Sequence, residues 1–508
     1  LKMRFLWLMG LVLVQLGTCT TSKERFRILA LMPADGKSHW QFAEPILEEL
    51  AKRGNDVTVV GHFPRKIPMQ NYHDISIADD ANPTLNSKNT EAMDSKSYFG
   101  TMMGSKISIH LCNEVLQPQI LDFMHHAMED VCHNPSYIPN SWTGKSTHMN
   151  FLNRVENFVE TLMYKIVYNH YDKLCTEIAR ENFGKEMPPL EEIANRVSIM
   201  LMNTHFVNYM ARPLVPGVKE IGGVHIPENK PLPAVNEFYF FFCSIAVAAK
   251  KEILQRILMN KNWISGATHG VVYFSLGSML RTESLSLDKR KAFFNAFGAL
   301  PQRVLMKWEG NQTEGLPANV RTVKWSPQFD VISHPNVKAF IYHGGMLGIT
   351  EAVYAGIPMI VIPVYGDQPT NAALLQEKGF AVVLQYSEIT KETLLTALGK
   401  VLHEPRYISK TAKRMSAVIR DRLVSPLDEA VYWIEYVARH QGAPWLRTPA
   451  NEMPLYQYLL LDVVGFIIVL LFVLVIGTWL MVRKLYALFF RGIRVSGTDQ
   501  RTHPCLYF

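Results

Sequence analysis

The segment from residue 337 to residue 351 carries residue types that can hold a diphosphate. An apolar run at 337–342 predicts a buried strand, and it is followed by His343, Gly344 and Gly345 and then by a predicted helix. Glycines let backbone N–H groups approach an anion closely, and the N-terminus of a helix favours negative charge. His343 can donate a hydrogen bond to a phosphate oxygen. The pattern predicts a nucleotide-sugar pocket at the carboxyl end of a parallel strand.

Four further polar residues are predicted to complete this pocket. Glu351 lies on the helix that follows the glycines and can accept both hydroxyls of a ribose. Asp367 and Gln368 follow a second apolar run at 358–364 and suit the hydroxyls of a sugar. Ser278 follows a third apolar run and a glycine, and it can donate to a phosphate. Taken singly, each could be an ordinary turn, core or surface residue, but their order and spacing together favour function.

Strands and helices alternate through the second half of the chain. Apolar runs predict strands at residues 271–276, 304–308, 320–324, 337–342, 359–363 and 381–384, with helices that include 391–402 and 408–422. The first half opens with a predicted strand at 25–32, a loop at 33–38, a helix at 40–53 and a strand at 56–60, and a long helix is predicted at 153–174. We therefore expect an α/β fold with two facing doubly wound domains, which leave a ligand cleft at the carboxyl ends of both sheets.

Composition narrows the class of protein. The 508 residues are 48% hydrophobic and 19% charged, which is typical of a globular chain of more than one domain. Much of the net charge of +7 comes from arginines and lysines near the C-terminus, so nothing indicates a nucleic-acid partner. The six cysteines are irregularly spaced and form no metal-type pairs, and no acidic metal-binding cluster is present in the sequence.

Both ends of the chain carry apolar segments. A basic residue, a short apolar run and small residues within 1–20 predict a secretory signal, with an N-terminal buried helix as the alternative. Residues 463–482 contain no charge and are long enough to cross a bilayer. The basic residues Arg483 and Lys484 come directly afterwards, which predicts a cytosolic tail at 483–508 and a luminal body.

The chain resembles the membrane-bound UDP-glycosyltransferases of animals, and the insect members most of all. The matching segments are FSLGS at 274–278, WSPQ at 325–328, HGG at 343–345, GDQ at 366–368 and the run from 420 to 462 that leads into the apolar span. The resemblance implies the GT-B fold. It places an acceptor-binding domain at 21–233 and a UDP-sugar-binding domain at 266–445, separated by an atypical insertion or linker at 234–265.

The resemblance also implies roles for residues on both sides of the cleft. Trp325 offers a face for stacking uracil, and Gln328 offers a polar edge for recognising it. His39 corresponds to the histidine that deprotonates the acceptor hydroxyl, and its place at a helix N-terminus disfavours the charged ring. The alternative for His39 is a helix-capping role. The attack of the activated oxygen would invert an α-linked donor to a β-glycoside.

Two departures from the family pattern stand out. Family members orient the catalytic histidine with an aspartate at the end of a strand, and no such strand is evident between residues 116 and 140, where Asp122 and Asp130 are the nearest acids. We expect both acids to be ordinary surface carboxylates. The uncharged stretch within 234–261 is unusual for the family. We interpret the first departure as a skipped exon and the second as a translated intron or a lineage insertion.

The function expected is transfer of a hexose, glucose rather than glucuronic acid, from a UDP-sugar to a hydroxyl of a small lipophilic acceptor, as in detoxification or in hormone or pigment conjugation. The alternatives are a catalytically impaired member that binds UDP-sugar or pairs with active relatives, and an active enzyme with a faulty gene model. We expect no metal and no cofactor, a glycan at Asn311, a homo- or hetero-oligomer as an option, and a single-pass type I protein of the endoplasmic reticulum membrane.

Overall fold

The computed structural model describes residues 25–32, 36–77, 134–140, 143–227, 261–278, 280–310, 314–403 and 408–496. The chain divides into two compact units, one that ends at Arg447 and one that begins at Thr448. All strand pairs in the described sheets are parallel, and helices connect most of the successive strands, so the predicted α/β class is confirmed.

The larger sheet has six strands in the order β11-β10-β9-β6-β7-β8. Its strands are β6 (Val271–Ser275), β7 (Arg303–Lys307), β8 (Val320–Val323), β9 (Val337–Tyr342), β10 (Met359–Val361) and β11 (Ala381–Val383). The chain starts at β6, runs outward to β8, and then returns to place β9 on the other side of β6. This reversal is the topological switch point, beside which open α/β sheets bind their ligands.

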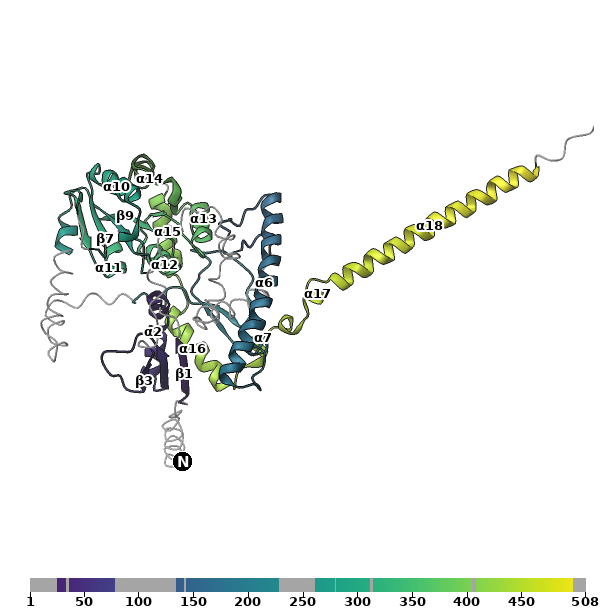
Figure 1. Ribbon diagram of the computed structural model, residues 1–508, viewed down its shortest axis with the longest axis horizontal. Coiled ribbons are helices and arrows are strands. Elements are labelled where there is room, and N and C mark those ends of the chain that lie inside the picture. The colour runs from purple at the N-terminus through teal and green to yellow at the C-terminus, as the bar shows by residue number, and fades with distance from the viewer. Residues whose placement is uncertain are drawn as a thin grey trace, which may run out of the picture. The chain divides into compact units, whose positions relative to one another are not determined.

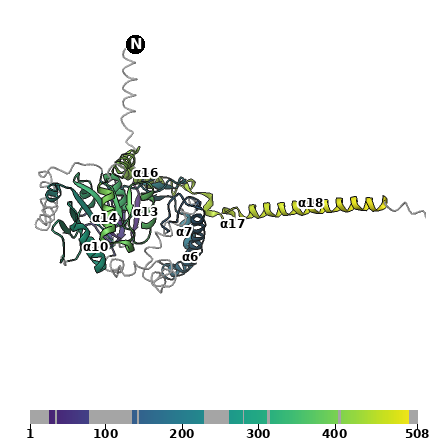
Figure 2. The same cartoon turned by 90° about the horizontal axis from the view of Figure 1, so that it is seen from above.

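All six of these strands were predicted, with boundaries that differ by up to two residues. The runs are apolar on both faces because helices cover both sides of the sheet. One face packs against α11 (Gln328–Ile332), α12 (Met346–Ala355) and α15 (Ile408–Arg420). The other packs against α10 (Leu287–Gly298) and α14 (Lys391–His403). Figure 1 shows helices of both layers, and Figure 2 shows α10 and α14 of the second layer from above.

The smaller sheet has the order β1-β2-β3, formed by β1 (Arg27–Met32), β2 (Asp56–Gly61) and β3 (Tyr72–Ser76). Helix α2 (Lys37–Lys52) packs on it through Ile46, Leu47 and Leu50. The prediction of a loop at 33–38 was wrong for its last two residues, because the helix already begins at Lys37. Helix α16 (Pro426–Arg439) contributes Ala430 and Val431 to the same core (Figure 1), so the chain crosses back to this sheet after completing the larger one.

Strand β1 forms one edge of the smaller sheet among the described residues. Its Leu29 and Leu31 side chains are each 64% exposed, on the face that α2 does not cover. Exposed leucines on an edge strand are unusual, since such edges promote unwanted strand pairing. Among the described residues, no helix packs over this face of β1.

The remaining elements of the first unit are α6 (Phe151–Phe183), α7 (Leu190–Asn195) and a small sheet of β4 (Met200–Met202) and β5 (Val218–Glu220). Helix α6 extends beyond the predicted 153–174 at both ends, from a side-chain cap by Asn150 to Gly184. The prediction stopped early because it followed the aromatic periodicity, whereas the polar residues that follow also favour helix.

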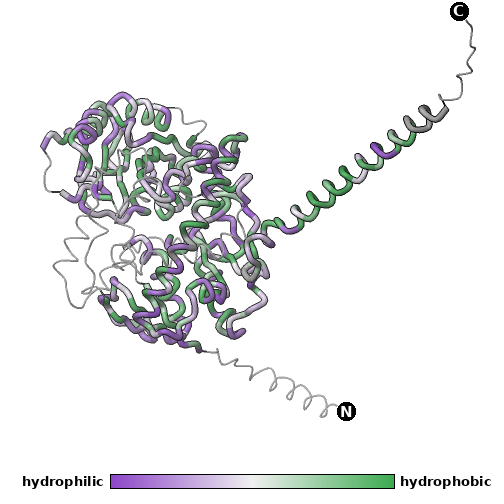
Figure 3. The backbone as a smooth tube through the Cα atoms, turned by 45° about the vertical axis from the view of Figure 1, so that its right-hand side comes forward, coloured by the Kyte–Doolittle hydropathy of each residue, from purple (hydrophilic) through white to green (hydrophobic). Residues whose placement is uncertain are grey.

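The second unit is dominated by α18 (Leu461–Ser496), of which Leu461–Phe489 is apolar and long enough to cross a membrane. Figure 3 shows this apolar length. The helix extends past the predicted 463–482 and continues through Arg483, because backbone hydrogen bonding need not end where the apolar run ends. The Arg483 guanidinium lies 5.4 Å from the centroid of the Trp479 ring. Short helix α17 (Leu455–Tyr458) precedes α18.

Several predictions fall outside the described residues. They concern the signal at 1–20, most of the insertion at 234–265, the two acids Asp122 and Asp130, the glycosylation site Asn311 and the end of the tail.

Candidate functional site

Three neighbouring strands end together at the switch point. Ser275 of β6 pairs with Tyr342 of β9, and Tyr342 pairs with Val361 of β10. Because the last residues of these three strands pair with one another, the three predicted segments that follow them lie at one edge of the sheet. These are Gly277–Ser278 after β6, His343–Gly345 after β9 and Asp367 after β10.

The turns at these strand ends are tight enough to need glycine. Gly277 has φ +78° and Gly344 has φ +97°. The His343 ring lies between two glycines, because a Cβ on Gly277 would be 2.4 Å from Cε1 and one on Gly345 would be 2.7 Å from Nε2. Gly345 is also the N-cap of α12, so the amides of the first helical turn open toward the same edge. The arrangement suits an anion.

His343 is a neutral ring in this site. Burial lowers its pKa to about 3, with a smaller contribution from the positive charge of Lys307. Its Nδ1 atom has no hydrogen-bond partner within the described part of the chain. Buried polar atoms usually have partners, so this nitrogen is suited to a ligand or a water molecule. A neutral imidazole offers a phosphate one N–H donor and no charge.

Lys307 supplies a positive charge that the sequence analysis missed. Its Nζ donates to the Gly277 carbonyl at 2.6 Å and forms an ion pair of 2.8 Å with Glu309. The residue ends β7, next to β6 in the sheet. The sequence feature that could have identified Lys307 is its place at the carboxyl end of β7, the strand beside the one that leads into the glycine turn.

Glu351 is held within α12, behind the glycine turn. The Gln328 amide nitrogen lies 2.6 Å from Oε2 of Glu351. Burial is the largest cause that raises the pKa of Glu351 to about 7; the Gln328 hydrogen bond opposes the shift and the charge of Asp330 adds to it. The amide nitrogen of Gln328 donates to Glu351, and its carbonyl oxygen is the group that can accept from a ligand. The two residues predicted to contact ribose and base therefore also contact each other.

Trp325 and His39 belong to opposite lobes, and Lys37, which lies in the same helical turn as His39, approaches the Trp325 ring. The Trp325 side chain is 55% exposed, so a ring face is open for stacking. Lys37 Nζ, at the first residue of α2, lies 5.9 Å from the Trp325 ring centroid. His39 is exposed and lies in the same helical turn. Gly36 gives its ring room, because a Cβ there would be 2.4 Å from Nδ1.

Asp367 and Gln368 have different environments. Asp367 is exposed, and its Oδ2 accepts from Asn371 at 2.7 Å. Gln368 is buried, and its Oε1 accepts from the backbone N–H groups of Val364 and Tyr365 at 2.9 and 3.2 Å. The carbonyl oxygen of Gln368 is thereby occupied, so only its amide N–H groups can bind a sugar hydroxyl, by donating to it. Asn371, which the sequence analysis missed, also donates to the Gly344 carbonyl at 3.0 Å and so joins the two loops.

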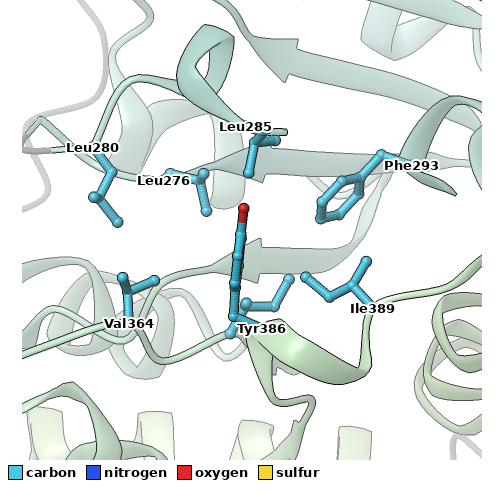
Figure 4. Close-up of a pocket in the computed structure, with 8 residues that line it drawn as sticks. Leu276, Leu280, Leu285, Phe293, Val364, Tyr386 and Ile389 are labelled. Atoms are coloured by element: carbon cyan, nitrogen blue, oxygen red, sulfur yellow. The ribbon is translucent and has the colours of Figure 1, made fainter. Parts of the chain in front are cut away.

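A small apolar cavity lies beside these strand ends (Figure 4). It is lined by Leu276, Leu280, Leu285, Phe293, Ile362, Val364, Tyr386 and Ile389. The lining offers no charged group, so the cavity does not suit a diphosphate. Across the described residues no group of three or more His, Cys, Asp or Glu side chains is placed to hold a metal ion. That no metal or cofactor takes part remains a prediction.

The chain is similar to a large group of known proteins. A family model described as "UDP-glucoronosyl and UDP-glucosyl transferase" matches residues 86–494. UDP-glycosyltransferase UGT5 of Dactylopius coccus is 35% identical over 92% of this chain and 94% of its own length. UDP-glucosyltransferase 2 of the same organism is 34% identical over 90% and 93%. UDP-glucuronosyltransferase 2A3 of Cavia porcellus is 31% identical over 85% and 88%.

Among solved structures, CalG4, the calicheamicin glycosyltransferase, is similar over 82% of this chain and 99% of its own, with 16% identity and a TM-score of 0.47. A likeness of this size supports no argument about function. The GT-B assignment is instead carried by the two parallel sheets, the helix that crosses back between them, and the sequence relatives.

Proposed function

Because this chain belongs to the UDP-glucuronosyl and UDP-glucosyl transferase family, we propose that it transfers glucose from UDP-glucose to a hydroxyl of a small lipophilic acceptor. Family membership makes it a glycosyltransferase with a UDP-sugar donor and an acceptor. The preference for glucose is supported by the similarity to UDP-glucosyltransferase 2 of Dactylopius coccus. Glucuronic acid is the competing donor, since UDP-glucuronosyltransferases are also similar to the chain.

One observation carries the donor half of the proposal. Polar groups from three strands meet at the switch point of the larger sheet, behind two glycine turns and a helix N-terminus. In the proposed complex the diphosphate lies against Gly344, Gly345, Ser278 and His343. The ribose hydroxyls donate to Glu351.

The base and the sugar occupy the two sides of this position. Uracil stacks on Trp325, and the Gln328 carbonyl accepts from the N–H of its imide. The hydroxyls of the sugar donate to Asp367, and the amide of Gln368 donates to one of them.

We assign His39 the role of general base. Neutral imidazole removes the proton from the acceptor hydroxyl, and the oxygen attacks the anomeric carbon on the face opposite UDP. The bond from that carbon to the β-phosphate oxygen breaks, UDP leaves, and the configuration inverts. Support comes from the helix that carries His39, whose first residue reaches Trp325 on the donor side of the cleft.

The proposed location is the endoplasmic reticulum membrane, with the first unit in the lumen. The apolar length of α18 supports one membrane span, and the basic residues within its last part support a cytosolic end. A luminal enzyme beside a membrane has access to lipophilic acceptors, as in detoxification or in hormone or pigment conjugation.

The test uses microsomes that contain the full chain, with UDP-glucose or UDP-glucuronate and a panel of phenols. We expect glucoside formation by the wild-type protein and at least about a hundredfold less by His39→Ala, since general-base catalysis contributes roughly that factor or more. Binding of UDP-glucose, measured by calorimetry on detergent-solubilised protein, should be unchanged by that substitution. Glucuronide formation without glucoside would contradict the donor preference, and a folded protein without UDP affinity would contradict the whole proposal.

A second candidate is a member of the family that binds UDP-sugar without transferring it. The observation that favours it is the exposure of Leu29 and Leu31 on β1, which fits the loss of a covering element and of the aspartate expected with it. UDP-glucose binding combined with equal, background-level product from wild type and His39→Ala would support this candidate. A transcript that encodes an additional strand near residue 117 and lacks residues 234–249 would instead identify a faulty gene model of an active enzyme.

A further inference from the structure

His225 is a buried histidine beside Glu351 that the proposed mechanism does not yet use. Its side chain is 5% exposed, and its Nε2 lies 3.8 Å from Oε1 of Glu351. Neither ring nitrogen makes a hydrogen bond of ordinary geometry with any residue that the structure describes. The Leu347 carbonyl is near enough to favour the protonated ring, but burial dominates and lowers the pKa of His225 to about 4. A buried ring whose nitrogens make no hydrogen bond of ordinary geometry destabilises the fold, so its position beside Glu351 needs an explanation.

The chain reaches this position through a glycine pair that packs closely against α12. Gly223 has φ +102°, and a Cβ on it would be 2.6 Å from the Tyr354 hydroxyl. The Gly222 carbonyl accepts from Arg422 at 2.8 Å. On either side of the pair, Ile221 and Val224 belong to the core beneath the smaller sheet. His225 therefore extends from the core of one lobe to a helix of the other.

The two oxygens of Glu351 face different partners. Gln328 donates to Oε2, whereas Oε1 faces His225 across a gap slightly longer than a hydrogen bond. A carboxylate that accepts two ribose hydroxyls must keep its plane fixed, and a contact at only one oxygen leaves it free to rotate. A donor at the second oxygen removes that freedom.

We propose that His225 is a positioning residue for the donor, which holds Oε1 of Glu351 through its Nε2–H when the ribose binds. The inference rests on the proposed function, because it assigns the ribose hydroxyls to Glu351. The segment that joins the two lobes thereby contributes to donor affinity. His225 does not touch the reacting atoms, so it affects binding and leaves the chemical step unchanged.

The test compares UDP with 2′,3′-dideoxy-UDP in calorimetry on the solubilised full chain. His225→Phe keeps the volume of the ring and removes both nitrogens, whereas His225→Gln restores an N–H near the position of Nε2. His205→Phe is the matched control, because His205 is also buried, in the same part of the chain, and has an aromatic contact with Phe206 rather than a contact with Glu351.

We expect His225→Phe to weaken UDP binding about tenfold and dideoxy-UDP binding less than about twofold, the coupling expected when two groups share one partner. His225→Gln should recover most of the loss, and His205→Phe should leave the UDP to dideoxy-UDP ratio unchanged. In active microsomes the KM for the donor should rise in His225→Phe while kcat remains within about twofold.

Equal losses for both ligands in His225→Phe, or no loss for either, would overturn the inference while the proposed function stands. A wild-type protein that binds UDP and dideoxy-UDP equally would overturn it too, because Glu351 would then not recognise ribose. A folded wild-type protein that does not bind UDP at all would overturn the proposed function and this inference together.

Discussion

Glu351 faces two conflicting demands. In the proposed complex it must be ionised to accept two ribose hydroxyls, yet burial raises its pKa to about 7. The cause is the loss of hydration, which disfavours the charged form of any buried carboxyl group. The Gln328 hydrogen bond recovers part of this cost. Near neutral pH a fraction of the ligand-free protein therefore carries a protonated Glu351, and donor binding must release that proton.

Donor affinity should consequently rise with pH. Below the pKa of Glu351, each lower pH unit should weaken UDP-glucose binding by up to about tenfold, and above it the affinity should level off. UDP-glucose, rather than UDP, is the ligand to use in this measurement, because the diphosphate of UDP-glucose does not titrate in this pH range. Calorimetry between pH 6 and pH 8 measures the slope. His343 and His225 do not contribute, because burial lowers their pKa values to about 3 and about 4.

The matched control for this prediction is Glu351→Gln. We expect weaker binding with no slope that can be assigned to position 351, since an amide does not ionise. A wild-type profile that is flat from pH 6 to pH 8, or the same slope in both proteins, would show that this carboxylate is not the titrating group.

At the scale of the element, β6 and β9 meet where the chain reverses direction. The turn after β6 must approach the turn after β9 closely enough to enclose His343, and Gly277 makes this possible. An L side chain at φ +78° is strained, and here it would also collide with the imidazole. The glycine is required by both the backbone and the contact.

Gly277→Ala should separate these two effects when it is compared with Gly315→Ala. Gly315 has φ +77°, and a Cβ on it would meet nothing within 4 Å. Both substitutions should destabilise the fold by about 1–2 kcal/mol through backbone strain. Only Gly277→Ala should also weaken UDP binding, by about tenfold, because His343 must move. Thermal unfolding and calorimetry measure the two effects, and equal UDP affinity in the two variants would contradict the role of this contact.

At the scale of the whole molecule, the described residues divide at Arg447 and Thr448. The first unit contains every candidate site residue. The second contains α18, whose apolar length suits one crossing of a bilayer. The candidate site and the candidate membrane span therefore lie in separate parts of the sequence.

A chain that ends at Arg447 should leave the membrane and retain its site. We expect the full chain to remain in the pellet after an alkaline carbonate wash, and the shortened chain to appear in the soluble fraction with its UDP affinity within about twofold, since no site contact is removed. Continued membrane association of the shortened chain would contradict a single anchor and would direct attention to the exposed apolar residues of α6, such as Phe151 and Phe158.

Sequence patterns predicted the larger sheet well because its strands are short continuous apolar runs between clear turns. The smaller lobe was harder, since residues 134–227 are held by scattered contacts such as Asn208 to Thr350 rather than by regular periodicity. Missed residues share one property. Lys307, Asn371 and His225 each contact a residue distant in the chain, namely Gly277, Gly344 and Glu351, and local spacing does not indicate these contacts.

The sequence by itself determined the two α/β lobes, the glycine turn at Gly344 and the apolar C-terminal helix, because these depend on local periodicity, glycine and helix ends. Only the tertiary structure decided that Gln328 meets Glu351, that Lys37 reaches Trp325 and that His225 faces the buried carboxylate. These contacts join segments far apart in the chain. Their distances, and the desolvation that raises the pKa of Glu351, depend on how the lobes pack.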